Sequence, residues 1–191
     1  MAQSSQTISG QKTFKSAITV SEGCSFRASD NRISAASTSL ANLAVRDLIT
    51  ITGTTYNNAT FTVKSVDADG AYITVEETVT TENSDGSTDT VLTYSGFVTD
   101  KYKGDGYYSQ ADGIHTVAYH VNTTCTGAIK MQGSLATTPT EDDWFDITGT
   151  TFTTDLSTTI SANNFTGNFV WVRAKCTSNT AGSVTKILYN N

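Results

Sequence analysis

The chain has 191 residues, 37% of them hydrophobic, with 14 glycines and one proline, and a formal net charge of −6. This length allows one large β domain or two small ones with an arm. An acidic chain without a cluster of Lys and Arg lacks the positive surface that phosphate groups require, so we expect no nucleic-acid partner and no membrane partner. Threonine is over-represented, and its β-branched side chain favours strands. Composition therefore predicts an all-β fold.

Residues 1–45 are polar and contain few large apolar side chains. Because so little apolar surface cannot close a core, we predict an extended N-terminal arm that becomes ordered against a neighbouring subunit. Phe14 is our candidate contact residue in this arm. The first residues show neither the charged start nor the apolar centre of a signal peptide, so we expect synthesis in a cytoplasm.

Residues 46–100 are predicted to form a small β-barrel or β-sandwich module. Apolar and β-branched residues alternate over 48–52, 61–66, 71–77 and 90–94, and turn-forming residues separate these runs. A module of this size is close to the lower limit for independent stability, so packing onto partner subunits is expected.

A linker is predicted at 101–106, where glycine and charged residues are frequent. Residues 107–191 are predicted to form a C-terminal antiparallel β-sandwich, because short turns join six expected strands. These strands are expected at 114–124, 127–135, 144–147, 150–154, 165–177 and 182–189.

The run 168–176 has the clearest strand pattern in the chain. Alternation assigns its two faces to different environments. The apolar face, predicted to be sandwich core, holds Val170, Val172, Ala174 and Cys176. The opposite face, predicted to contact the second sheet and a partner, holds Phe169, Trp171, Arg173 and Lys175. Arg173 and Lys175 are expected to meet the acidic loop 141–143 of the same or a neighbouring subunit, and Arg173→Glu is then expected to weaken assembly without unfolding.

No group of residues indicates catalysis or a bound cofactor. His115 and His120 lie five apart on one predicted strand, so they should face opposite sides and serve structural or solvated roles. Cys24, Cys125 and Cys176 are expected to be buried thiols, and a Cys125–Cys176 bridge remains an alternative.

The acidic loop has two interpretations. Glu141, Asp142 and Asp143 precede Trp144, and Asp146 follows it. A solvated loop is the main prediction, and a Ca²⁺ site is the alternative. We predict no metal site here.

Aromatic side chains also allow two interpretations. A platform for stacking on sugar rings would use Trp144, Phe145, Phe169, Trp171, Tyr107 and Tyr108. The preferred interpretation places Phe169 and Trp171 in a core or a subunit interface, where aromatic rings bury a large area.

Three patches carry a resemblance to proteins of tailed bacteriophages. The run Gln-Thr-Ile-Ser-Gly-Gln-Lys-Thr-Phe at 6–14 resembles a short repeat of tail-fibre and adhesin proteins. Residues 47–75 look like a small β module of phage virion proteins. The segments Asp-Trp-Phe at 143–145, Gly-Asn-Phe-Val-Trp-Val-Arg-Ala at 167–174 and Ile-Leu-Tyr-Asn at 187–190 are similar to the C-terminal β-sandwich of structural proteins in marine tailed phages.

This resemblance implies a non-enzymatic virion component that forms trimers or rings and contacts other virion proteins. A tail, fibre or adaptor protein is the expectation, with capsid decoration as one alternative and a module that binds a host surface glycan as another. The candidate interface residues are Phe14, Phe169, Trp171, Arg173, Lys175, Trp144, Glu141, Asp142 and Asp143.

Overall fold

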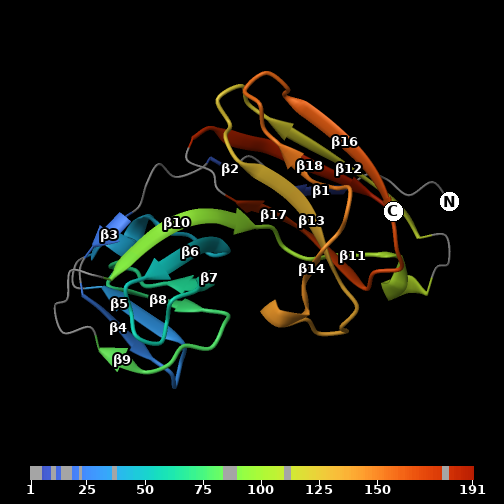
Figure 1. The fold of residues 1–191 in the computed structure, drawn as a ribbon. Coiled ribbons are helices and arrows are strands. Elements are labelled where there is room, and N and C mark those ends of the chain that lie inside the picture. Colours follow the sequence, from blue (N-terminus) through green and yellow to red (C-terminus); the bar gives the residue numbers. More distant parts are fainter. Residues whose placement is uncertain are drawn as a thin grey trace. The chain divides into compact units, whose positions relative to one another are not determined.

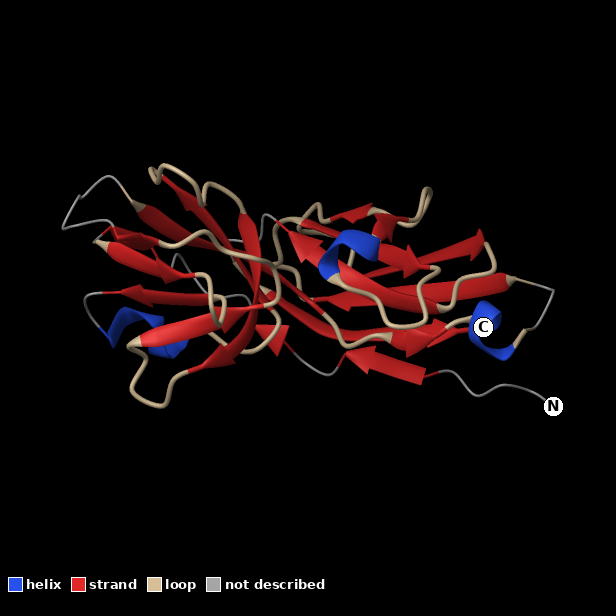
Figure 2. Cartoon of the chain, turned by 90° about the horizontal axis from the view of Figure 1, so that it is seen from below, coloured by secondary structure: helices blue, strands red, loops and turns tan. Residues whose placement is uncertain are grey.

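The computed structural model of the chain describes residues 6–9, 12–13, 19–21, 23–35, 38–83, 90–109, 113–177 and 181–191. Strands dominate these residues, as Figures 1 and 2 show, and the helical elements are short 3-10 turns. The all-β prediction is therefore confirmed. None of the helices in this part of the chain has the length and apolar character needed to cross a membrane. The chain divides into two compact units, residues 16–97 and residues 1–15 with 98–191.

The unit of residues 16–97 contains one antiparallel sheet with the strand order β3-β10-β6-β7-β8-β5-β4-β9. β3 and β9 end this order, so the described strands form an open sheet and not the closed barrel that was one alternative. The elements are β3 (Thr19–Ser21), β4 (Cys24–Arg27), β5 (Arg32–Ala35), η1 (Thr38–Asn42), β6 (Asp47–Thr52), β7 (Thr60–Val66), β8 (Tyr72–Val75), β9 (Glu82–Asn83) and β10 (Val91–Val98).

The core of this unit is formed by alternate residues of short strands. Ile33, Ile49, Ile73 and Leu92 are fully buried, although they lie on strands far apart in the sequence. η1 adds the buried Leu40. Among the described residues, six strands (β4 to β8 and β10) each contribute between one and four buried apolar side chains, and the core closes because all six contribute at once.

The turn after β7 requires glycine at its fourth position. Gly70 has a φ of 70° and donates its N–H to Asp67 O at 3.0 Å. A Cβ atom here would lie 2.5 Å from the backbone nitrogen of Ala41 in η1. The turn predicted at 67–70 is therefore present, and it allows η1 to approach closely.

The predicted N-terminal arm over 1–45 is wrong for residues 24–35 and 38–42, which form β4, β5 and η1. β4 and β5 form a hairpin inside the sheet, with Cys24, Phe26 and Ile33 buried. This segment contains few apolar residues. They alternate along β4 and β5, however, and pack into a core to which distant strands contribute most of the side chains. The backbone of β1 (Gln6–Ser9) pairs with β18 of the same chain. Phe14 lies outside the described residues.

The second unit is a sandwich of two antiparallel sheets. One has β18 and β12 at its centre, flanked by β1 and β2 on one side and β16 on the other. The second pairs β13 with β17, β14 and β15, and pairs β11 with β17. The remaining elements are β2 (Lys12–Thr13), β11 (Tyr102–Lys103), η2 (Asp105–Tyr108), β12 (Ile114–Val121), β13 (Ala128–Ser134), η3 (Glu141–Asp143), β14 (Phe145–Asp146), β15 (Phe152–Thr153), β16 (Ile160–Thr166), β17 (Trp171–Thr177) and β18 (Ser183–Asn190).

Contacts across the sandwich join the two sheets. Tyr119 of β12 stacks at 6.3 Å, ring centre to ring centre, on Phe152 of β15. Its hydroxyl donates to Thr150 O at 2.8 Å. A buried phenol needs such a partner, and this one links the strands as well as satisfying the oxygen. The predicted C-terminal sandwich is therefore present.

The two histidines face opposite sides of β12, as predicted. His115 is fully buried and its ring lies 4.9 Å from that of Phe165. Its Nε2 donates to Gly167 O at 2.7 Å, and its Nδ1 lies 2.8 Å from the Tyr189 hydroxyl. Both ring nitrogens thus have partners, as expected of a structural histidine. His120 is half-buried on the other face.

The linker predicted at 101–106 is instead part of the sandwich. β11 pairs with β17, and the N–H groups of Gly104 and Gly106 donate to Val170 O and Phe169 O at 3.0 and 2.8 Å. A Cβ atom on Gly104 would lie 2.5 Å from Phe169 O. Glycine here permits close packing of two backbone segments. In the sequence, a glycine needed for close packing cannot be told apart from a glycine in a flexible linker.

All three cysteines are buried, as predicted. Cys125 is a free thiol, and burial raises its pKa to about 11. The alternative of a Cys125–Cys176 bridge is therefore wrong.

Candidate functional site

The outer face of β17, in the unit of residues 1–15 and 98–191, holds three of the nine predicted interface residues: Trp171, Arg173 and Lys175. On the inner face Val172, Ala174 and Cys176 are fully buried, as alternation predicts. The pattern fails at its start, because β17 begins at Trp171, Phe169 is 8% exposed and Val170 is half-buried. Phe169 packs near His115, Phe165 and Phe145, so it belongs to the core and not to the outer face.

Arg173 is bound inside its own chain. Its two terminal nitrogens donate to the two carboxylate oxygens of Glu141 at 2.8 and 2.7 Å. Its Nε donates to Gln132 Oε1 at 2.9 Å, and its guanidinium carbon lies 4.2 Å from the ring centre of Trp144. Planar, bidentate and stacked contacts of this kind use the full geometry of a guanidinium.

The expected meeting of Arg173 with the acidic loop thus occurs within one chain, through Glu141. Arg173 is 4% exposed, so it cannot serve as a free surface contact. A carboxylate at this position would face Glu141 in a buried site, so we now expect Arg173→Glu to destabilise the unit.

The other acidic residues have separate partners. Asp143 accepts hydrogen bonds from the backbone N–H of Thr140 at 2.7 Å and from its hydroxyl at 2.8 Å, and these bonds lower the pKa of the Asp143 carboxyl. Asp142 is exposed. Among the described residues, no three His, Cys, Asp or Glu side chains come together in a way that could hold a metal ion.

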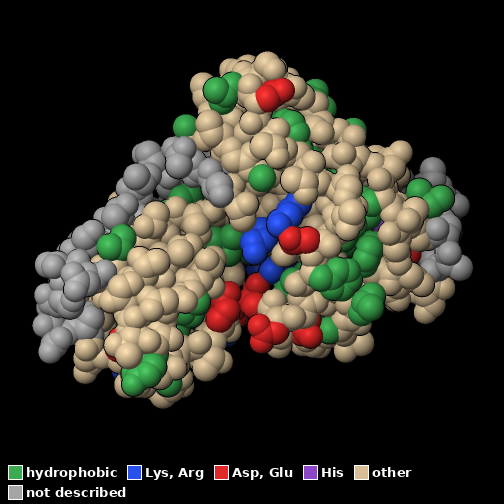
Figure 3. Space-filling view, in the orientation of Figure 1, with side chains coloured by type: hydrophobic (Ala, Val, Ile, Leu, Met, Phe, Trp, Pro, Cys, Tyr) green, Lys and Arg blue, Asp and Glu red, His purple; other side chains and the backbone are tan. Residues whose placement is uncertain are grey.

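A second ion pair lies beside Arg173 on the same face. Lys130 pairs with Asp146, which also accepts from Gln132 Nε2 at 2.9 Å. Burial raises the pKa of Asp146, but the hydrogen bonds from Lys130 and Gln132 outweigh burial, so the net shift is downward. Lys175 lies opposite Lys130 in the strand register, and burial together with the charge of Arg173 lowers its pKa. Figure 3 shows Lys and Arg side chains gathered with acidic ones on this side of the molecule.

Two exposed tyrosines and the half-buried Trp171 lie where β11 and η2 meet β17. Tyr107 and Tyr108 are 44% and 51% exposed, and Trp171 is half-buried. The ring centre of Tyr107 lies 5.1 Å from that of Trp171 and 5.3 Å from that of Tyr108. We call these three residues, with Lys101 and Lys103, the Tyr107 patch.

Two lysines cover the rings of the Tyr107 patch. The Lys103 ammonium lies 4.0 Å from the ring centre of Tyr107, and that of Lys101 lies 4.7 Å from the ring of Trp171. Such cation–π contacts hold the lysines over the aromatic rings. Of the residues named for a sugar platform, Phe169 is buried, Arg173 lies over Trp144 and lysines lie over Tyr107 and Trp171, whereas Phe145 and Tyr108 are exposed.

The sequence-based prediction missed the two lysines of the Tyr107 patch. Their signal was the order Lys-Tyr-Lys-Gly-Asp-Gly-Tyr-Tyr at 101–108, in which cations and aromatic residues interleave. Its glycines led to the linker interpretation. Only the pairing of β11 with β17 places these residues beside Trp171.

A comparison of the chain with models of known protein families and with curated protein sequences finds no match.

Proposed function

We propose that this chain is a non-enzymatic structural component of a tailed-phage virion, a tail, fibre or adaptor protein that acts through contacts between subunits. The observation that carries the proposal is the Tyr107 patch. It gathers Tyr107 and Tyr108 of η2 beside Trp171 of β17, and the two tyrosines keep about half of their surface exposed. Tyrosine and tryptophan are the residues that most often dominate the binding energy of protein interfaces. The resemblance of residues 6–14 and 167–174 to phage proteins supplies the biological setting.

Charge favours a second copy of the chain as the partner. The Tyr107 patch contributes two lysines, whereas the whole chain carries a net charge of −6. Another copy therefore carries a net negative charge, which suits contact with a cationic aromatic patch. The same charge pattern opposes binding to nucleic acid.

The test compares Tyr107→Ser with the matched control Tyr56→Ser. Tyr56 is 69% exposed and belongs to the other unit, so its removal changes an exposed tyrosine outside the Tyr107 patch. Sedimentation velocity over a micromolar concentration series should show an oligomer for the unmodified chain. Tyr107→Ser should weaken self-association about 30-fold, the loss of one interface hot spot of about 2 kcal/mol. Tyr56→Ser should have no effect.

A chain that remains monomeric throughout this series would overturn the proposal. Equal weakening by both substitutions would also overturn it, since the effect would then not belong to the Tyr107 patch. Circular dichroism of both variants checks that the β signal is retained.

A further inference from the structure

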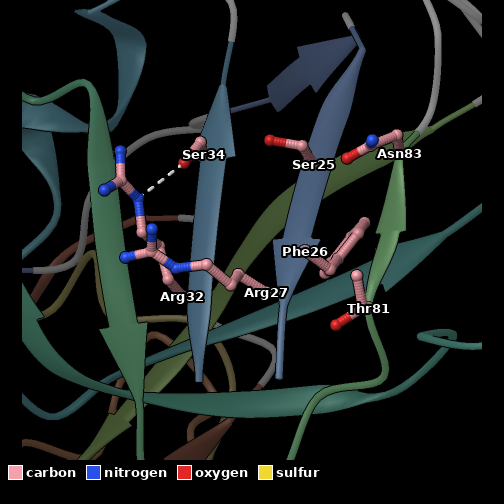
Figure 4. Close-up of a pocket in the computed structure, with 7 residues that line it drawn as sticks. All are labelled: Ser25, Phe26, Arg27, Arg32, Ser34, Thr81 and Asn83. Carbon is pink, nitrogen blue, oxygen red and sulfur yellow. Dashed lines mark hydrogen bonds between the residues drawn. The ribbon is translucent and has the colours of Figure 1, made fainter. Parts of the chain in front are cut away.

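The unit of residues 16–97 carries a pocket of about 300 Å³ on one face of β4, β5 and β9 (Figure 4). The pocket is lined by Ser25, Phe26, Arg27, Arg32, Ser34, Thr81 and Asn83. Phe26 is 2% exposed, and alternation along β4 places its side chain on the opposite face of the sheet from Ser25 and Arg27. The open face of the pocket is therefore lined by two arginines, three hydroxyl groups and an amide.

The strand register explains why these residues converge. Arg27 lies directly opposite Arg32, and Ser25 lies opposite both Ser34 and Asn83. The cross-strand pair Arg27–Arg32 thus offers two guanidinium groups. Two positions before Arg27 on β4, Ser25 and its cross-strand partners offer hydroxyl and amide groups. Like charges directly opposite each other destabilise a strand pair unless an anion compensates them. Asp30 forms an ion pair with Arg27, whose hydrogen bond lowers the pKa of Asp30. The charge of Arg32 also helps to lower this pKa, but among the described residues only Arg27 is hydrogen-bonded to this carboxylate.

Arg32 is held in place without an anion of its own. Its guanidinium carbon lies 3.7 Å from the ring centre of Tyr72, and its Nε donates to Ser34 Oγ at 2.9 Å. Its two terminal nitrogens have no hydrogen-bond partner among the residues that the structure describes. A guanidinium fixed in this way offers a preformed pair of parallel donors.

Arg173 shows what completes such a site. It has the same three elements in the other unit: an aromatic ring 4.2 Å away, a side-chain oxygen on Nε, and a carboxylate on both terminal nitrogens. Arg32 has the ring and the oxygen and lacks the carboxylate. A carboxylate from a ligand would supply this third element.

We propose that this pocket binds an acidic sugar, a monosaccharide unit whose carboxylate pairs with Arg32 and whose hydroxyl groups meet Ser25, Ser34, Thr81 and Asn83. The volume is at the lower end of the range for small-molecule sites, so it suits one sugar ring better than a bare inorganic anion. Hydroxyl and amide side chains at neighbouring register positions supply both donors and acceptors for a polyhydroxylated ring. Binding of an acidic sugar would be a function separate from the proposed subunit assembly, and it does not depend on that assembly.

The experiment is a calorimetric or NMR titration of the full chain with galacturonic acid, galactose and inorganic phosphate. Galacturonic acid should bind with a dissociation constant on the order of millimolar, the affinity of one small ligand held by a few polar contacts. Galactose has the same ring and no carboxylate, so it should bind about tenfold more weakly or worse. Phosphate should bind more weakly than galacturonic acid.

Two variants and one control locate the site. Arg32→Gln should weaken galacturonic acid binding about tenfold or more, and Ser25→Ala should weaken it about threefold. Lys64→Gln removes the same charge from an exposed lysine that does not line the pocket, and should change binding less than about twofold. All three should retain the oligomeric state of the unmodified chain, which separates this test from that of the proposed function.

Four results would overturn the proposal: no binding at concentrations on the order of 10 mM, equal binding of galactose, phosphate binding as tight as that of galacturonic acid, or unchanged binding in Arg32→Gln. The third would identify a site for anions alone.

Discussion

Arg173 and Arg32 occupy closely similar surroundings in the two units and differ in one respect. Each is stacked on an aromatic ring, and each gives its Nε hydrogen to a neighbouring side-chain oxygen. Arg173 is 4% exposed and paired with Glu141, whereas Arg32 is half-buried and lacks a carboxylate. A guanidinium whose donors are satisfied within the chain stabilises the fold, and one with preformed free donors can hold a ligand.

Removing the satisfied arginine should have the largest effect. Arg173→Met leaves the Glu141 carboxylate without its partner at a largely buried position, so we expect the unit of residues 98–191 to lose about 3 kcal/mol of unfolding free energy. The matched substitution Arg32→Met should cost the other unit less than about 1 kcal/mol, since no buried charge loses its partner. Chemical denaturation, followed by fluorescence, measures both. Equal losses of unfolding free energy in Arg173→Met and Arg32→Met would contradict the proposed difference between the two arginines.

Acid should weaken the face around Arg173 to a smaller extent. The folded-state pKa of Asp146 lies below its unfolded value of about 3.9, because hydrogen bonds from Lys130 and Gln132 favour the ionised form. Its contribution is therefore complete above about pH 5 and is lost as the pH falls through the lower folded pKa. Solvent screens this half-exposed pair, so the contribution should stay below about 1 kcal/mol.

Denaturation of the unmodified chain and of Asp146→Asn at pH 6 and pH 3 measures this contribution. The difference in stability between the two pH values should be smaller in the variant. An identical difference in both proteins would show that Asp146 does not contribute.

The smallest expected effect comes from supplying Arg32 with a carboxylate. Ser25 lies on the neighbouring strand, diagonal to Arg32 in the register, so Ser25→Glu should bring a carboxylate within its reach. Stability should rise by about 0.5 kcal/mol, while binding of galacturonic acid should be abolished. Ser25→Gln, of similar size and without charge, is the control. A variant that still binds the acid with unchanged affinity would show that Arg32 is not the carboxylate-binding group.

Sequence alone predicted the features that depend on local chemistry. The abundance of threonine and the alternation of apolar residues predicted strands, and the Val172, Ala174 and Cys176 face is buried as expected. Gly53 and Gly149, which follow Ile-Thr in two identical five-residue runs at 51–55 and 147–151, have φ values of 80° and 81°. A positive φ favours glycine in any protein, so this information is local.

Tertiary structure alone decided which partner each polar or sparsely apolar segment meets. The acidic loop could have contacted its own chain or another, and strand pairing placed Glu141 against Arg173. The sequence of β4 and β5 resembled an arm because it has few apolar side chains. A core shared by many strands needs only a few buried side chains from each strand. Local periodicity specifies the face on which a side chain lies, but only the register between distant strands specifies the residue opposite it. That is why Arg27 and Arg32, five residues apart in an unremarkable segment, form a pair of cations beside a pocket.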